Sequence, residues 1–340
     1  MLNNFLWKIL FLGVLFFGNP IYNYGQQSEK NIYSSIESGL RNPSEVEYLE
    51  LTNIPYISAD IAKFINLSEL YIYNCNIETL PNEILALSKL KIIVADNNKL
   101  KKLPKNMGDL KNLEKISLSG NLFSKFPAEI LQNTNLQVIN LANNQIKEIP
   151  IEIYNLTKLK VLELSFNKIS GFKNNFQLPQ NLQYLYLSNN KIKNLDFKLS
   201  QLKSICLDNN HLESIPESLL FVNSLVIFDI SNNKLIKIPS KISSLKNLVK
   251  FNVSNNQLAQ IPEEISQLRN LQYLNLANNN LSEIPHQISQ IQTIIEINLC
   301  KNNLTKIPEE FIEIKSLKRL GISGNIISVY PLWLENIKKY

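Results

Sequence analysis

The sequence predicts a solenoid, a fold in which short repeats stack along one axis and each repeat touches only its neighbours. An asparagine recurs at one fixed interval, the step from Asn98 to Asn121, and a single shorter step separates Asn190 from Asn210. A leucine pattern, LxxLxLxxNxLxxLPxxIxxL, surrounds each asparagine, as in the segment from Leu271 to Ile291. A repeat of this length cannot bury its apolar residues alone, so it must stack on others. The recurring asparagines are Asn98, Asn121, Asn144, Asn167, Asn190, Asn210, Asn233, Asn256, Asn279, Asn302 and Asn325.

Each repeat is expected to contribute one short strand to a parallel sheet. Apolar and polar residues alternate around Leu274 and Leu276, so these leucines point to the core while Tyr273 and Asn275 point away. The recurring asparagine follows the strand, where the turning backbone leaves N–H and C=O groups in need of partners. Its amide can bond to its own repeat and to the adjacent one, so we expect a ladder of asparagines along the core.

The opposite side of each repeat is expected to carry a short α- or 3-10 helix. Proline recurs in one slot of most repeats, and it suits the first position of a helix, where its missing N–H costs nothing. Glutamate often follows, as Glu263 follows Pro262, and complements the positive end of the helix. Apolar residues three apart, such as Ile265 and Leu268, then turn one face inward.

Residues 1–25 are expected to be a secretory signal peptide. One lysine, Lys8, precedes an apolar run from Ile9 to Phe17, and small and polar residues follow the run. The run is shorter than the roughly 20 apolar residues that a membrane span needs. We therefore expect cleavage near Gln26 and no stable membrane anchor.

Residues 26–45 are expected to form an N-terminal helical cap over the open end of the core. Ile32, Ile36 and Leu40 are spaced four apart, which places them on one face of a helix. The repeats, about 13 in number, then occupy residues 46–340.

The C-terminal end of the array has no distinct cap in the sequence. Trp333 and Tyr340 are expected to cover the last layer themselves. In the alternative arrangement, the open end pairs with another copy and gives a homodimer through the C-terminal end. The shorter step between Asn190 and Asn210 also predicts a local bend or twist, near Phe172 to Leu202.

The pattern resembles that of the leucine-rich repeat family over residues 46–340. Its 23-residue LPxxIxxL variety is similar to the repeats of Ras-pathway scaffolds and of many secreted bacterial leucine-rich proteins. The resemblance implies an α/β fold, a right-handed horseshoe with a parallel sheet on the concave face and short helical or 3-10 segments on the convex face. It also implies protein binding, usually on the concave face. Because members do different jobs, the resemblance names a mode of action and no pathway.

The residues give little support to catalysis. His211 and His286 stand on different repeats, and neither has a third group beside it to complete a catalytic set. The sequence has no Gly-rich phosphate loop and no His/Cys cluster with metal-ligand spacing. We therefore expect no enzyme activity, no cofactor and no metal site.

The charge distribution argues against a nucleic-acid partner, although the net charge of +6 raises the question. A phosphate-binding groove needs a basic surface, but the outward columns of the predicted sheet contain more acids than bases. The acids are Glu69, Asp96, Glu163, Asp208, Asp229 and Glu296, and the bases are Lys115, Lys250 and Arg319.

The expected binding surface is the concave sheet face, where departures from small and polar residues are informative. Tyrosine offers a large contact area at little cost in rotamer freedom, and the tyrosine side chains are expected to be exposed there. The carboxylates are expected to form a polar rim for a basic partner. Strand propensity is an alternative explanation for Tyr and Val on this face. The candidate residues are Tyr71, Tyr73, Ile92, Val94, Asp96, Val138, Val161, Glu163, Phe166, Tyr184, Tyr186, Asp208, Ile227, Asp229 and Tyr273.

The sequence thus indicates an exported, non-enzymatic protein-binding module. Three cysteines without disulfide-bonded caps, together with abundant Asn, Lys and Ile, favour a bacterial export product such as an adhesin or a host-interaction factor. Two alternatives stay open. One is a self-assembling envelope scaffold, and the other is an intracellular signalling scaffold of the Ras-pathway type, which requires that the N-terminal run is no signal.

Overall fold

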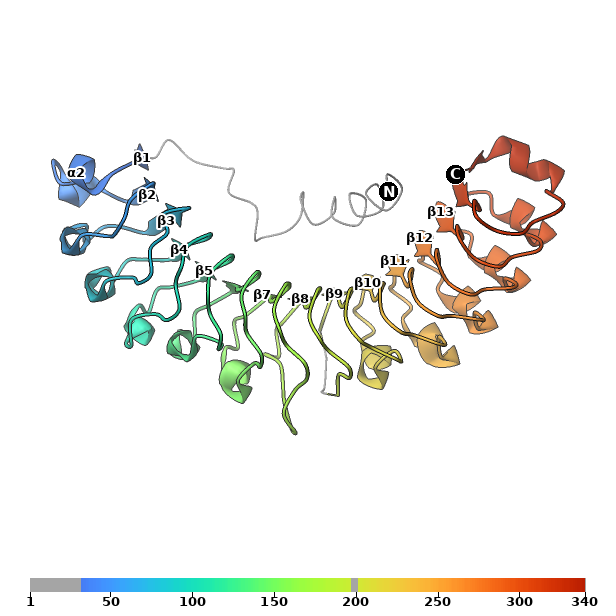
Figure 1. The fold of residues 1–340 in the computed structure, drawn as a ribbon, viewed down its shortest axis with the longest axis horizontal. Coiled ribbons are helices and arrows are strands. Elements are labelled where there is room, and N and C mark those ends of the chain that lie inside the picture. The colour runs from blue at the N-terminus through green and yellow to red at the C-terminus, as the bar shows by residue number, and fades with distance from the viewer. Residues whose placement is uncertain (1–31, 197–200, 340) are drawn as a thin grey trace. The chain divides into compact units, whose positions relative to one another are not determined.

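The computed structural model describes residues 32–196 and 201–339 of the 340-residue chain. The described residues form two compact units, the first from residues 32–168 and 179–182 and the second from residues 169–178 and 183–339. Within each unit the strands are parallel and follow sequence order on one side, and the 3-10 helices lie on the other side (Figure 1). The segment predicted as a signal peptide lies outside the described residues.

The first unit contains seven of the described strands. Its strands are β1 (Ile32–Tyr33), β2 (Tyr48–Thr52), β3 (Glu69–Tyr73), β4 (Ile92–Val94), β5 (Lys115–Ser117), β6 (Val138–Asn140) and β7 (Val161–Glu163). Its helices are α2 (Ile36–Gly39) and the 3-10 helices η1 (Pro43–Glu45), η2 (Ala59–Lys63), η3 (Asn82–Ala86), η4 (Met107–Asp109), η5 (Ala128–Gln132) and η6 (Ile151–Asn155).

The second unit contains eight of the described strands. Its strands are β8 (Tyr184–Tyr186), β9 (Ser204–Cys206), β10 (Ile227–Asp229), β11 (Lys250–Asn252), β12 (Tyr273–Asn275), β13 (Glu296–Asn298), β14 (Arg319–Gly321) and β15 (Lys338–Lys339). Its 3-10 helices are η7 (Glu217–Phe221), η8 (Ser240–Ser244), η9 (Glu263–Gln267), η10 (His286–Gln290), η11 (Glu309–Glu313) and η12 (Leu332–Asn336).

Strand pairing follows the period of the sequence. Tyr273 on β12 pairs with Glu296 on β13, which lies one full period later in the chain. Tyr184 on β8 pairs with Ser204 on β9, although this repeat is the short one. The short repeat therefore loses residues outside the strand, and the side chains keep their alternation between core and open face.

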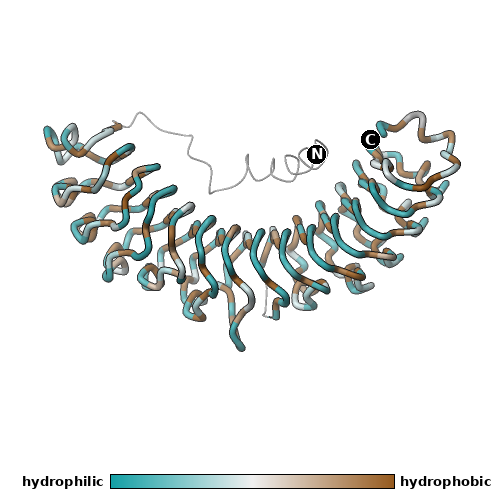
Figure 2. Tube along the Cα trace, in the orientation of Figure 1, coloured by the Kyte–Doolittle hydropathy of each residue, from teal (hydrophilic) through white to brown (hydrophobic). Residues whose placement is uncertain are grey.

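The core of each repeat is built from the inward leucines and isoleucines. Leu274 and Leu276 are fully buried, as are their counterparts Ile297 and Leu299 in the next repeat. Figure 2 shows the result as hydrophobic and hydrophilic segments that alternate along every turn of both units. Stacking each repeat on the next thus buries apolar surface that a single repeat leaves in water.

The helical segments opposite the sheet are 3-10 helices, and most of them begin one residue after the recurring proline rather than at it. Pro262 lies at the N-cap of η9 with φ −69° and ψ 142°, so its backbone is still extended. Its carbonyl accepts from the backbone N of Ile265 at 3.2 Å, and the Ile265 carbonyl accepts from Leu268 N at 3.0 Å. This chain of i to i+3 bonds brings both apolar side chains under the segment, as the tighter 3-10 turn requires.

The N-terminal helix is shorter than predicted, and the expected face of Ile32, Ile36 and Leu40 is wrong. Ile32 lies in β1, which pairs with β2, and its side chain is half exposed. The helix α2 comprises only Ile36–Gly39, and the Ser35 hydroxyl caps it by accepting from Ser38 N at 3.1 Å. Without β1, the backbone groups along one side of β2 would have no strand to pair with. The prediction from residue spacing considered only the apolar side chains and therefore missed this pairing.

At the C-terminal end, β15 pairs in parallel with β14 and extends the sheet of the second unit. Leu334 is buried, and the Trp333 indole N–H donates to a Glu309 carboxylate oxygen at 3.2 Å. Tyr340, expected to join Trp333 over the last layer, lies outside the described residues. Residues 164–196 and 201–216, around the short repeat, contain no helix, while the predicted bend stays a prediction.

Candidate partner-binding face

The open face of the sheet is formed in each unit by the outward residues of its strands. Twelve of the fifteen candidate residues lie in strands β3, β4, β6, β7, β8, β10 and β12, on the side away from the fully buried leucines. Asp96 and Asp208 follow their strands by two residues, and Phe166 follows β7 by three. The candidates up to Phe166 belong to the first unit and those from Tyr184 onward to the second.

The recurring asparagines hold each turn to the preceding repeat. The amide oxygen of Asn144 accepts from Phe123 N at 3.0 Å, across the repeat boundary. Its amide nitrogen donates to the carbonyls of Leu118, Leu141 and Ala142 at 3.0–3.1 Å. The same arrangement recurs along both units, so these buried amides satisfy backbone groups that water cannot reach.

A second hydrogen-bond pattern explains two acidic candidates. At the last residue of several strands, an Asn side chain accepts from the backbone N two residues later, as Asn252 does from Ser254 and Asn275 from Ala277. Asp229 accepts from Ser231 N at 2.9 Å in the same way. Glu163 likewise accepts from the backbone N of Ser165, two residues later. Hydrogen bonds to the local backbone therefore explain why carboxylates occupy these two positions, and no binding partner is needed to explain them.

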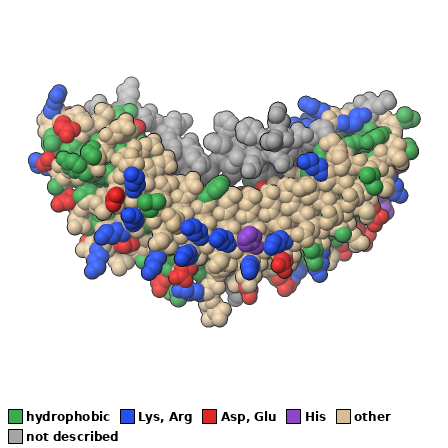
Figure 3. All heavy atoms as spheres, in the orientation of Figure 1, with side chains coloured by type: hydrophobic (Ala, Val, Ile, Leu, Met, Phe, Trp, Pro, Cys, Tyr) green, Lys and Arg blue, Asp and Glu red, His purple; other side chains and the backbone are tan. Residues whose placement is uncertain are grey.

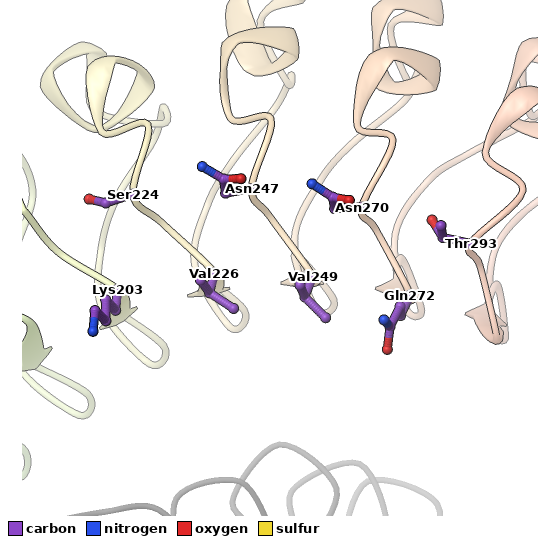
Figure 4. Close-up of a pocket in the computed structure, with 8 residues that line it drawn as sticks. All are labelled: Lys203, Ser224, Val226, Asn247, Val249, Asn270, Gln272 and Thr293. Carbon is purple, nitrogen blue, oxygen red and sulfur yellow. The ribbon is translucent and has the colours of Figure 1, made fainter.

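A third pattern, which the sequence analysis missed, is a row of amides and hydroxyls just before the strands. Asn247 and Asn270 donate to the carbonyls of Asn223 and Lys246 in the preceding repeats, at 2.8 and 2.9 Å. In the second unit this row borders a groove of about 380 Å³ (Figure 4). The signal was an Asn that recurs directly before the first leucine of many repeats. Because these amides bond to the chain itself, the groove wall is a structural feature.

The most apolar part of the open face lies on β2, β3 and β4 of the first unit. Tyr48, Tyr71 and Val94 are buried there, with Tyr73 and Ile92 packed against them. The ring centroids of Tyr48 and Tyr71 lie 4.8 Å apart, and those of Tyr71 and Tyr73 lie 5.9 Å apart. These distances are typical of favourable aromatic contacts. We call these five residues the tyrosine cluster.

Two candidate tyrosines are less accessible than predicted. Tyr71 is 5% exposed and Tyr186 is 3% exposed, so the expectation that both side chains are exposed is wrong. The Tyr71 hydroxyl donates to a Glu69 oxygen at 2.9 Å. Burial, and then this hydrogen bond, raise the pKa of Tyr71 above its ordinary value. Neighbouring strands about 4.8 Å apart crowd large rings, which a single-strand view underestimates.

The charged groups of the open face are tied to the protein in several places. Asp96 accepts from the Ser117 hydroxyl at 2.6 Å and from Ser119 N at 2.9 Å. Burial nevertheless raises the pKa of Asp96, and burial lowers the pKa of Lys115 on the neighbouring strand. Many lysines lie elsewhere, in the turns after the recurring asparagines, and Figure 3 shows basic side chains spread over the visible side of the molecule. The acidic rim is thus partly a structural feature.

Phe166 stands out because its backbone is strained and its side chain is exposed. Its φ is +57°, in the left-handed region, and 54% of the side chain is exposed. The slot directly before the recurring asparagine has positive φ throughout, and most repeats place Asn there, as at Asn143, or Gly, as at Gly120. Asn and Gly tolerate this conformation, whereas a bulky residue does not. The fold thus keeps an exposed aromatic ring at a conformational cost.

Replacing Phe166 by asparagine is expected to stabilise the fold by about 1 kcal/mol, because strained positions of this kind cost of order 1–3 kcal/mol. The check is the urea midpoint of the variant against the parent. A matched control is Asn143→Phe, which places the same ring in the same slot of an earlier repeat and is expected to destabilise by a similar amount. A Phe166→Asn variant less stable than the parent would contradict the strain.

Two general properties of the described residues bear on function. No helix in residues 32–196 and 201–339 is long and apolar enough to cross a membrane. Within the same residues, no group of three or more His, Cys, Asp or Glu side chains is arranged to hold a metal ion.

The chain is similar to known proteins along most of its length. The family model described as "Leucine rich repeat" matches residues 134–192, 223–281 and 269–327, and "Leucine Rich repeats (2 copies)" matches residues 180–220. Together these matches span more than half of the chain.

Individual proteins agree with the family models. Leucine-rich repeat-containing protein 58 of Xenopus laevis is 45% identical over 67 residues, and the match spans 19% of each chain. A leucine-rich repeat protein of Leptospira interrogans has the same fold, with TM-score 0.79, 24% identity, and coverage of 91% of this chain and 99% of that one. The plant peptide hormone receptor RGFR1, solved in complex with RGF2, gives TM-score 0.54 and 26% identity over 82% of this chain and 54% of its own. This chain belongs to the leucine-rich repeat family.

Proposed function

We propose that this chain is an exported, non-enzymatic module that binds a protein through the open sheet face of its first unit. The observation that carries the proposal is the tyrosine cluster on β2, β3 and β4. The leucine-rich repeat fold is typically an interaction fold, and the receptor in complex with RGF2 is one neighbour found with a partner. In the bacterial setting that the sequence favours, the module acts as an adhesin or a host-interaction factor.

The tyrosine cluster differs from the rest of the open face in its chemistry. The strands β11, β12 and β13 end at Asn252, Asn275 and Asn298, whose side chains accept from the backbone N two residues later. The corresponding positions of β3 and β4 hold Tyr71 and Val94 instead. Aromatic and aliphatic side chains grouped on one surface are typical of interface hot spots. The polar side chains on β11, β12 and β13 bond to their own backbone, whereas Tyr73 and Ile92, which are partly exposed over the buried Tyr71 and Val94, offer apolar contact area.

Phe166 supports the same reading from an independent direction. Strained residues persist where the surroundings hold them in place, and they gather at functional sites. Phe166 is exposed, so its ring adds little packing to the fold that could offset the cost of its positive φ. Contact between the ring and a bound protein supplies a favourable free energy that offsets this cost.

The test is photo-crosslinking from defined positions on the full chain. A benzophenone amino acid placed at Tyr73 or at Phe166 is expected to capture the same protein from extracts or from candidate host cells. The matched control is the same probe at Tyr154, which is 50% exposed and lies on η6 of the same unit, on the 3-10 side. Capture from Tyr154 alone would contradict the proposed face and place the partner on the 3-10 helices.

Export has a separate test. The N-terminal sequence of the protein purified from its own cells is expected to begin near Gln26, as cleavage of a signal peptide requires. A mature protein that still begins at Met1 would favour the alternative of an intracellular signalling scaffold.

A further inference from the structure

The final repeat of the described residues exposes four large apolar side chains close together in sequence. Ile326, Val329, Tyr330 and Leu332 all lie within seven residues of sequence, after β14 and up to the first residue of η12. Their exposed fractions are 65%, 75%, 54% and 85%. We call these four residues the terminal patch.

The preceding repeats provide an internal comparison for three of these positions. In each of the five repeats before it, the slots of Ile326, Val329 and Leu332 hold polar residues. For the Ile326 slot these are His211, Lys234, Gln257, Asn280 and Asn303; for the Val329 slot Ser214, Lys237, Gln260, Glu283 and Lys306; and for the Leu332 slot Glu217, Ser240, Glu263, His286 and Glu309. Since a repeat of this kind folds well with polar residues there, folding does not explain the apolar ones.

Tyr330 occupies a slot that is apolar in the preceding repeats as well. Its slot holds an isoleucine in the preceding repeats, such as Ile284 and Ile307, which are 6% and 3% exposed. Those isoleucines lie between two layers, whereas Tyr330 remains more than half exposed. The terminal patch therefore combines three apolar replacements with one core position that the described residues leave accessible.

The exposed area suits a macromolecular partner. The four side chains together expose on the order of 500 Å², within the range of the largest patches on monomers, which are often functional. A stable pair of proteins buries about 800 Å² on each partner. The terminal patch thus provides most of one half-interface, and the surrounding charged residues provide the remainder.

The surroundings of the terminal patch favour a second copy of the same chain. Exposed acids on η11, Glu309, Glu310 and Glu313, and exposed lysines, Lys306, Lys338 and Lys339, border the same end of the second unit. In a two-fold interface each surface meets itself, so a rim of both signs can pair acid with base. A partner of one charge would meet repulsion from half of this rim.

The geometry also selects the kind of contact. β15 is an edge strand of two exposed lysines, and lysines on an edge oppose the addition of another strand. Apolar side chains, in contrast, bury well against their own copies. We propose that two copies of this chain associate through their terminal patches, side chain against side chain, without continuing the sheet.

The test is the association state of the full chain, with its N-terminus determined, by sedimentation velocity and light scattering over a range of concentrations. The parent is expected to form a dimer. The triple variant Ile326→Asn, Val329→Lys, Leu332→Glu carries the residues of the preceding repeat at the same slots. It is expected to raise the dissociation constant of the dimer at least about 100-fold, because three apolar contacts are lost.

A control variant tests whether the loss of the dimer depends on the terminal patch. Ile236 is 61% exposed on an inner repeat, and Ile236→Thr makes one exposed apolar side chain polar far from the terminal patch in sequence. This control is expected to dimerise as the parent does, and circular dichroism is expected to show the same fold in all three proteins. A parent that stays monomeric at about 100 μM, or a triple variant that still dimerises like the parent, would overturn the proposal. Neither outcome touches the proposed partner site, which the crosslinking experiment tests on the first unit.

Discussion

Replacing Asn144 by leucine is expected to lower the free energy of unfolding by about 3–4 kcal/mol, although leucine is apolar and close in size. The Asn144 oxygen is the partner of Phe123 N, and its nitrogen donates to three carbonyls. Those carbonyls keep other donors, for example Asn167 at Leu141 O, but Phe123 N loses the bond that satisfies it. A buried N–H without a partner costs about 1–3 kcal/mol, and each further lost bond adds of order 1 kcal/mol.

Urea denaturation of the variant and the parent measures this loss, and hydrogen exchange locates it. Because repeat arrays can unfold in parts, the amide of Phe123 is expected to exchange faster than amides several repeats away. The control is Asn155→Ala, at an exposed asparagine that closes η6, which is expected to change stability by less than about 0.5 kcal/mol. Equal midpoints for Asn144→Leu and the control would mean that the amide contributes no net stability.

The recurring asparagines also show why so much of the fold could be predicted. A solenoid repeats one local solution, so the period alone places the strand, the turn and the buried amide in every repeat. The parallel register follows, since Tyr273 and Glu296 occupy equal positions one period apart. The 3-10 segments follow as well, with an error of one residue at the proline. Each of these features depends on contacts that recur, which makes them visible in one sequence.

Features that occur once were predicted poorly. Ile32 lies in β1, which pairs with the outer side of β2. This pairing occurs once, so the repeat pattern of the sequence does not indicate it. The burial of Tyr71 depends on which rings stand on the neighbouring strands, here Tyr48. The strain at Phe166 was present in the sequence, since Asn or Gly fills its slot in most repeats, but it required a comparison of slots rather than of whole patterns.

The candidate residues fall into two groups, those that repeat a local hydrogen bond of the array and those that do not. The side chains of Asp229 and Glu163 accept from the backbone N two residues later, a hydrogen bond that recurs in the array. Their positions therefore say little about a binding partner. Tyr73, Ile92 and Phe166 do not follow this pattern. In a repeat protein, residues that break the local rule of their slot are expected at functional sites.

The second large effect is expected from Asp229→Asn, which stabilises the protein increasingly as the pH rises from about 4 to about 7. Asp229 is 8% exposed. Burial first, and the nearby Asp208 carboxylate second, raise the pKa of Asp229 from 3.8 to about 7. Asparagine fits this slot, since Asn252 and Asn275 hold it in the next two repeats with the same bond to the backbone.

The direction with pH follows from the two pKa values. A carboxyl whose pKa is higher in the folded state binds its proton more tightly there, so protonation favours folding. This contribution is complete below about pH 3.8 and is lost as the pH rises through 7, where the folded protein must hold a buried carboxylate. The advantage of the variant over the parent is therefore expected to be small near pH 4 and to grow to on the order of 2–4 kcal/mol at pH 8.

Urea midpoints of both proteins between pH 4 and pH 8 test this, because titrating groups that do not interact with Asp229 cancel in the difference, and the repulsion from Asp208 is part of the effect that is measured. The control is Asp196→Asn, an exposed aspartate of the same unit, for which no such growth with pH is expected. If Asp229→Asn and its parent have equal stability at pH 8, the carboxylate is ionised there without cost, and the hydrogen bonds from Ser231 and Asn252 offset its burial in full. If the advantage of the variant grows between about pH 4 and pH 7 and levels off above that, the open face of the second unit holds a carboxylate whose ionised form destabilises the fold.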